Sequence, residues 1–372
     1  MINNELTTKR KYELEQTIES NNDEFIEIDK SLSLSELVYL VEAFKMPYQE
    51  ILDSINDYDS KRYNAVVFAN YLADKYGVSR ENIIKRVYLD NAATTFPKPQ
   101  IVYEFMNEFY RANGGNAGRG NSTQSLSSGF LIQDTREKIL ELFHAPSKQV
   151  VFTSGATMSL NIIIQGLIKE GTRNIYISPF EHNAVTRTLH EFEKEKQISV
   201  YELNLDRNLN YDFEKIRYAF DNKKPELVII SHASNVFGLV SPVEKIFALA
   251  KKYGAVTLTD MAQTAGLVDL NLEQEIFDFA VFAGHKTLYG PTGIGGFVMK
   301  KNLNLKSIYF GGTGFESAKQ EMPSSLPERF EAGTLNILGI AGLNASVKWI
   351  LKTGIKNIYA KEIENREKLL KI

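Results

Sequence analysis

The chain has 372 residues, a formal net charge of −3, no cysteine, and 43% hydrophobic and 24% charged residues, an ordinary globular composition. The absence of cysteine excludes disulfides, thiolate metal sites and a cysteine nucleophile within the chain as given. No apolar run approaches the roughly 18 residues of a membrane helix, and the N-terminus lacks the apolar segment of a secretory signal. The near-neutral charge argues against nucleic-acid binding as the main task. We therefore expect a cytoplasmic protein of two or three domains with no membrane partner.

Residues 1–86 differ in charge from the rest of the chain. They hold 16 acidic and 11 basic residues, a net charge of −5, whereas residues 87–372 carry +2. Leu37, Leu40, Val41 and Phe44 recur at helical spacing. The sequence therefore predicts a helical N-terminal extension over residues 1–86.

One stretch of this extension, residues 72–80, has the alanine, glycine and apolar pattern of a helix-turn-helix. A DNA-binding regulator is thus one alternative. Phosphate contacts need clustered lysine and arginine, and the acidic balance opposes them. We expect a helical docking or dimer-capping segment instead, and nucleic acid is not an expected partner.

From Val87 onward, seven short β-branched runs alternate with segments of helical length. This alternation predicts a mostly parallel seven-stranded sheet with helices on both faces. We expect a large α/β domain over residues 87–346 and the start of an incomplete C-terminal small domain over residues 347–372. The predicted strands are residues 150–153, 174–178, 198–203, 227–231, 255–259, 279–283 and 294–299, and the predicted helices include residues 158–169, 212–221 and 242–253.

Polar residues at the ends of these runs are the candidates for chemistry, because ligands bind at the carboxyl ends of such strands. Residues 153–157 open a helix whose N–H groups suit a phosphate, although an ordinary helix cap is the alternative. Asp260 follows another run and is equally well explained as a cap. Lys286 lies between an apolar strand and a Gly/Pro turn, which is typical of a Schiff-base lysine, whereas alone it reads as a surface lysine. A phosphate cradle, a carboxylate and a lysine together predict pyridoxal 5'-phosphate (PLP) as the cofactor.

Six motifs then carry a resemblance to a known family. In order and spacing they are similar to the class V aminotransferases, specifically the cysteine desulfurases, over the chain from Tyr88 to about Leu351. The resemblance implies a PLP fold-type-I large domain and a homodimer. The motifs are residues 88–95 (YLDNAATT), 181–183 (EHN), 231–235 (SHASN), 260–266 (DMAQTAG), 284–286 (GHK) and 329–336 (RFEAGTLN).

The resemblance implies roles around the cofactor ring for five residues. Lys286 would hold the cofactor aldehyde as an imine and move protons, and Asp260 would pair with the pyridinium nitrogen. Gln263 would donate to the ring oxygen, and Asn235 would lie near the same edge. His182 would stack on the ring face and act with Lys286 in catalysis, and its alternative is a capping or core histidine.

Four further residues are implied at or near the phosphate. Thr157, the backbone at Ala156, and His285 would hold it, and Thr313 is similar to the segment that reaches the phosphate site of the partner subunit in the family dimer. Arg329 resembles an arginine near the active site with no assigned contact, and a charged surface residue is the alternative. We expect no metal site.

The chain departs from the family in two ways. Ala283 stands where the family usually has a hydroxyl that binds phosphate, which removes a hydrogen bond of about 1–3 kcal/mol. In the family, a small domain that follows this region brings the nucleophilic cysteine and the arginine that clamps the substrate carboxylate. Neither maps onto this chain, so it is either a truncated sequence or a protein that has lost that part.

Three functions therefore stay open. The first is a PLP-dependent enzyme of the cysteine desulfurase type, which takes sulfur from L-cysteine and passes it to an acceptor protein. The second is a cysteine-independent aminotransferase or a selenocysteine-lyase-like enzyme. The third is a non-catalytic PLP-binding relic or partner-binding protein. For the enzymes, the expected substrate is a small amino acid.

Overall fold

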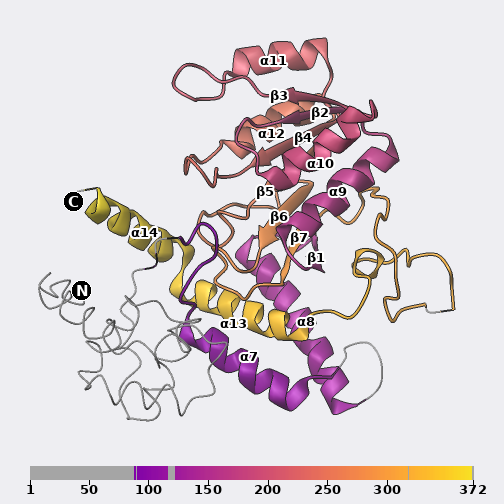
Figure 1. Cartoon of the computed structure of the whole chain (residues 1–372), viewed down its shortest axis with the longest axis vertical. Coiled ribbons are helices and arrows are strands. Elements are labelled where there is room, and N and C mark those ends of the chain that lie inside the picture. The colour runs from indigo at the N-terminus through magenta and orange to yellow at the C-terminus, as the bar shows by residue number, and fades with distance from the viewer. Residues whose placement is uncertain (1–87, 89, 116–121, 317, 371–372) are drawn as a thin grey trace, which may run out of the picture. The chain divides into compact units, whose positions relative to one another are not determined.

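The computed structural model describes residues 88, 90–115, 122–316 and 318–370 (Figure 1). The predicted helical extension over residues 1–86, with its helix-turn-helix-like stretch, lies outside these residues. Over the described ranges, no helix combines the length and apolar character needed to cross a membrane.

A seven-stranded mixed sheet forms the centre of the described chain, in the order β1-β7-β6-β5-β4-β2-β3. The pairs from β3 through β6 are parallel, and β7 is antiparallel to both β1 and β6. All seven predicted runs are strands, so the prediction of a mostly parallel sheet is confirmed. The strands are β1 (Gln149–Thr153), β2 (Asn174–Ile177), β3 (Ser199–Glu202), β4 (Leu227–Ser231), β5 (Val256–Asp260), β6 (Phe279–Ala283) and β7 (Gly295–Met299).

Helices cover both faces of this sheet, as predicted, because successive strand side chains point to opposite faces. Val151 belongs to one apolar cluster, whereas its neighbours Val150 and Phe152 belong to the other. The first cluster is covered by α9 (Ala156–Glu170) and α10 (Asn183–Lys194). The second is covered by α8 (Thr123–Leu142), α11 (Phe213–Asn222), α12 (Val243–Lys252) and α13 (Ile337–Thr353). The three predicted helices named above are α9, α11 and α12, with ends that differ by one or two residues.

The C-terminal helices form a layer beside the sheet. Helix α13 packs against α7 (Gln100–Asn113) and α8, and Figure 1 shows the three helices side by side. Helix α13 ends at Thr353 and is followed by Gly354, whose φ of 85° is unfavourable for other residues, and α14 (Ile355–Leu369) begins directly after this glycine. The predicted boundary between residues 346 and 347 falls inside α13, and the small domain stays a prediction.

The carboxyl ends of six strands, β1 to β6, lie at one edge of the sheet. Strands β4, β5 and β6 are parallel, and β1 runs in the same direction because β7 is antiparallel to both of its neighbours. Gly295 begins β7 at this edge, where an added Cβ would lie 2.7 Å from the Cα of Gly155. This close approach requires glycine, and it brings the start of α9 against the sheet edge.

Candidate functional site

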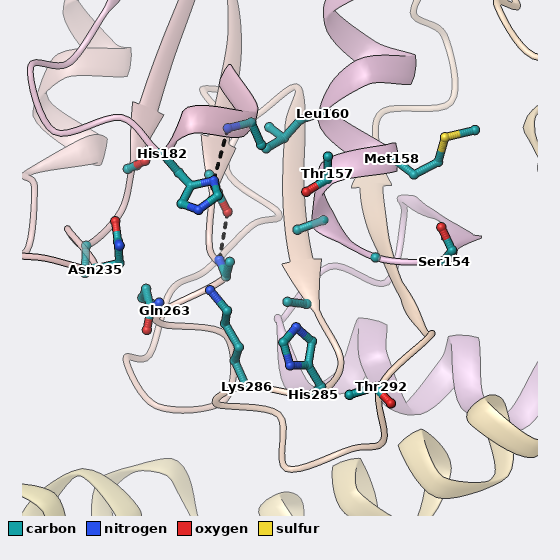
Figure 2. Close-up of a pocket in the computed structure, with 18 of the residues that line it drawn as sticks. Ser154, Thr157, Met158, Leu160, His182, Asn235, Gln263, His285, Lys286 and Thr292 are labelled. Carbon is teal, nitrogen blue, oxygen red and sulfur yellow. Dashed lines mark hydrogen bonds between the residues drawn. The ribbon is translucent and has the colours of Figure 1, made fainter. Parts of the chain in front are cut away.

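A cavity of about 380 Å³ opens at this edge of the sheet. Eight of the nine predicted site residues line it: Ala156, Thr157, His182, Asn235, Asp260, Gln263, His285 and Lys286. Figure 2 shows Thr157 and His285 on one side of the pocket and His182, Gln263 and Asn235 on the other, with Lys286 between them. Residues from five separate segments of the chain are therefore gathered in one place.

Thr313 is not among the residues that line this pocket. It lies in the loop after β7, where its hydroxyl accepts a hydrogen bond from the Phe315 N–H at 3.1 Å. Its predicted role toward a second subunit stays a prediction. Arg329 does not line the pocket either, and its guanidinium lies 5.5 Å from the ring centroid of Phe330.

The N-terminus of α9 is open toward the pocket. Gly155 is the residue before the helix, and no side chain in the described ranges caps it. A Cβ added to Gly155 would meet no atom within 4 Å. The first N–H groups of a helix have no partner within the helix, so those of Ala156 and Thr157 are available to an anion. The alternative of an ordinary Ser/Thr cap at residues 153–157 is therefore wrong.

His285 lies beside this helix end with an unsatisfied ring nitrogen. Its Nδ1 is buried and has no hydrogen-bond partner within the described part of the chain. Burial, then the positive charges of Lys286 and Lys98, lower the pKa of His285 and favour the neutral imidazole. A buried polar atom without a partner is rare, and in a pocket it marks a contact for a ligand.

Asp260 and Lys286 face each other across the middle of the pocket. Burial raises the pKa of Asp260, although the Ala262 N–H, Lys286 and His182 oppose this. Burial lowers the pKa of Lys286, which the charge of Asp260 opposes. Burial thus favours the uncharged amine, the form of lysine that attacks a carbonyl carbon. Asp260 also accepts from the Ala262 N–H at 2.9 Å, so it caps a turn and lines the pocket at once.

His182 likewise combines a cap with a place in the pocket. It is the N-cap of α10, and its Nδ1 accepts from the Ala184 N–H at 3.1 Å. This hydrogen bond assigns the proton of the neutral ring to Nε2. The capping alternative is therefore correct, yet the ring still lines the pocket, where Nε2–H can serve a ligand.

Gln263 is oriented by the segment that precedes α7. Its Nε2 donates to the backbone carbonyl of Ala92 at 2.9 Å, within the YLDNAATT motif. His232 lies behind the pocket and does not line it. The His232 ring pairs through Nδ1 with Thr264 Oγ1 at 2.9 Å, and burial lowers its pKa to about 4, so it stays neutral.

Four polar residues near the pocket had no predicted role. Ser154, Ser231 and Thr292 line it. Glu181 accepts from the hydroxyl of Ser178 at 2.5 Å and from the N–H of Ser231 at 2.6 Å. The position of Glu181 directly before His182 is the sequence signal that pointed to it.

The comparisons with known proteins agree with this geometry. The sequence profile described as aminotransferase class-V matches residues 87–372. A probable cysteine desulfurase from Methanothermobacter thermautotrophicus is 31% identical over 76% of this chain and 71% of its own length. A cysteine desulfurase from Shigella sonnei is 34% identical over 77% of this chain and 72% of its own length.

A solved structure shares the fold as well. The apo cysteine desulfurase from Thermococcus onnurineus superposes with a TM-score of 0.69 and 29% identity, covering 77% of this chain and 72% of that protein. The predicted fold-type-I architecture is thereby confirmed.

Proposed function

The chain belongs to the class V aminotransferase family, and on this premise we propose that it is a PLP-dependent enzyme of the cysteine desulfurase type. The observation that carries the proposal is the placement of Lys286 and Asp260 in one pocket with an uncapped helix N-terminus at its far side. An amine, a carboxylate and a phosphate site are the three elements that PLP requires. The substrate would be a small amino acid.

The residues of the pocket fit the cofactor from one end to the other. The N–H groups of Ala156 and Thr157 and the unpartnered His285 Nδ1 would hold its phosphate. Asp260 would hold the charge on its ring nitrogen, and Gln263 would donate to its ring oxygen. When bound, the cofactor supplies an electron sink for the α-carbon of an amino acid.

The protein's own groups then bind and move protons. Lys286 would attach covalently to the cofactor and, once displaced by substrate, would carry the proton to and from the α-carbon. Burial suits it to this task because it lowers the pKa of the amine. His182 would cover the ring face with its Nε2–H available, since Nδ1 is engaged by the Ala184 N–H.

Ala283 weakens the phosphate site without removing it. It is buried at the end of β6 and lines the pocket, where it offers no hydroxyl. The loss of one hydrogen bond, about 1–3 kcal/mol, is small beside the contacts that remain.

The second candidate function rests on the absence of cysteine from this chain. A cysteine-independent aminotransferase or a selenocysteine-lyase-like enzyme would use the same lysine and carboxylate without a protein thiol. We keep a PLP-binding relic as the non-enzymatic alternative. A second copy of the chain and, for the desulfurase, a sulfur-acceptor protein are the partners that we propose.

Borohydride trapping tests the proposal. The chain is incubated with PLP and reduced, and peptide mapping locates the adduct, which we expect on Lys286. Lys286→Ala should abolish it, whereas Lys215→Ala should not, because Lys215 is an exposed lysine of α11. An adduct on another lysine, or none on the wild-type chain, would refute the assignment.

A further inference from the structure

The backbone carbonyls of His285 and Lys286 accept hydrogen bonds from a segment that lies 191 positions earlier in the chain. The carbonyl oxygen of His285 accepts from the N–H of Thr95 at 3.0 Å and from the hydroxyl of Thr94 at 3.0 Å. The carbonyl oxygen of Lys286 accepts from the hydroxyl of Thr95 at 2.8 Å. Thr95 is buried, so its contacts with both carbonyls are shielded from water.

Lys98 completes this contact from the same segment. Its half-buried ammonium donates to the carbonyl of Thr95 at 2.6 Å and to that of His285 at 3.3 Å. Its positive charge is one of the causes that lower the pKa of His285. Lys98 therefore ties the segment to the turn and also favours the neutral form of the histidine beside it.

The other side of the Lys286 turn is closed by its own backbone. The N–H of Gly284 donates to the carbonyl of Ile294 at 3.0 Å, and that of Gly290 donates to the carbonyl of Gly284 at 2.7 Å. Between them Tyr289 takes a φ of 58°, a left-handed conformation that is unfavourable for a non-glycine residue. The turn thus needs support from its surroundings, and residues 94–98 provide it.

We propose that Thr94, Thr95 and Lys98 form a clamp that positions Lys286, holding its backbone so that the amine points at Asp260. A lysine side chain has four rotatable bonds, so an amine is aimed only if its Cα is fixed. The consequence for cofactor binding rests on the proposed function, but the clamp itself can be measured on the protein without cofactor. Within the described residues, the charged or titratable groups that share the pocket with the Lys286 amine are Asp260 at the end of β5, His285 on its own turn and His182 at the start of α10.

Competitive acetylation of the cofactor-free chain over a pH series tests the clamp directly. Mass spectrometry reads the labelling of Lys286 against exposed Lys215 as the internal reference. The Lys286 amine of the wild-type chain should titrate at a lower pH than the Lys215 amine, because burial lowers the pKa of Lys286. Thr95→Val should move the Lys286 profile toward that of Lys215, and Thr95→Ser, which keeps the hydroxyl, should restore the wild-type profile.

PLP titration of the same variants supplies the second measurement. Thr95→Val should bind PLP about five- to tenfold more weakly than the wild-type chain, as expected for one lost hydrogen bond. Thr95→Ser should bind as the wild type does. If Thr95→Val does not fold, Lys98→Met replaces it, with Lys98→Arg as the charge-retaining control.

The two proposals fail separately. A wild-type chain that traps no PLP on Lys286 refutes the proposed function, while the acetylation profiles still decide the clamp. A Lys286 profile unchanged in a folded Thr95→Val or Lys98→Met variant overturns the clamp, whatever the cofactor result.

Discussion

Glu181 and Ser231 are joined by two hydrogen bonds, in which the carboxylate accepts from the Ser231 N–H at 2.6 Å and from its hydroxyl at 2.9 Å. Glu181 directly precedes His182, and Ser231 pairs with Asp260 across β4 and β5. This one contact therefore links the His182 side of the pocket to the Asp260 side. The Glu181 carboxyl that makes this contact is titratable, so its protonation should alter the hydrogen bonding on both sides of the pocket.

Glu181 should make the stability of the fold depend on pH. Burial raises its pKa from 4.5 to about 7, so the folded chain binds this proton more tightly than the unfolded chain does. The free energy of unfolding should consequently fall as pH rises from about 5 to about 8. Glu181→Gln can keep all three hydrogen bonds without titrating, so urea denaturation should show a flatter pH dependence for this variant. Parallel curves for the two proteins would contradict the prediction.

Asp260 should contribute charge rather than only a cap. Asp260→Asn keeps the acceptor for the Ala262 N–H, so the turn should persist. Loss of the carboxylate from a buried ion pair with the cofactor should weaken PLP binding by about 3–5 kcal/mol. It should also lower the pKa of Lys286 further, because the charge of Asp260 raises it. PLP titration and acetylation profiles measure these effects, and unchanged PLP affinity would reduce Asp260 to a turn cap.

Glu331 should hold the RFEAGTLN motif to the sheet. Its carboxylate accepts from the Arg136 guanidinium at 2.9 and 2.7 Å and from the Phe152 N–H at 2.6 Å, and both charged side chains are buried. Glu331→Gln leaves the arginine charge without its partner, so urea denaturation should show a loss of about 3–5 kcal/mol. Glu316→Gln breaks an exposed pair with Lys319 and should cost at most about 1 kcal/mol. Equal effects of the two substitutions would argue against a structural role for the buried pair.

The strands could be predicted from the sequence because buried strands appear in it as short, continuous apolar runs. Residues 227–231 and 279–283 are buried throughout, and both are continuous apolar runs ending in a small residue. Strand direction has no such local signal, so the antiparallel insertion of β7 was not predicted.

The pocket could be predicted only as far as the motifs reached. Lys286 and Asp260 were found because each ends or follows a strand. The contacts of Thr95 with the Lys286 turn join positions 191 residues apart, so no local sequence pattern predicts them. The sequence predicts no role for Glu181 because its partner Ser231 lies 50 positions later in the chain, and the fold buries the two against each other.

The absence of cysteine gives the last prediction. Sulfur transfer to a protein persulfide requires a thiolate within the enzyme, and the 372-residue chain contains none. We therefore expect this chain, purified with PLP, to release sulfide from L-cysteine no faster than free PLP with an added thiol, and to carry no persulfide by mass spectrometry. The Lys286→Ala variant serves as the control for release that does not pass through the pocket. Turnover clearly above free PLP, lost in Lys286→Ala and without a protein persulfide, would overturn the prediction. It would favour the cysteine-independent alternative, in which Lys286 carries the proton and no protein thiol takes part.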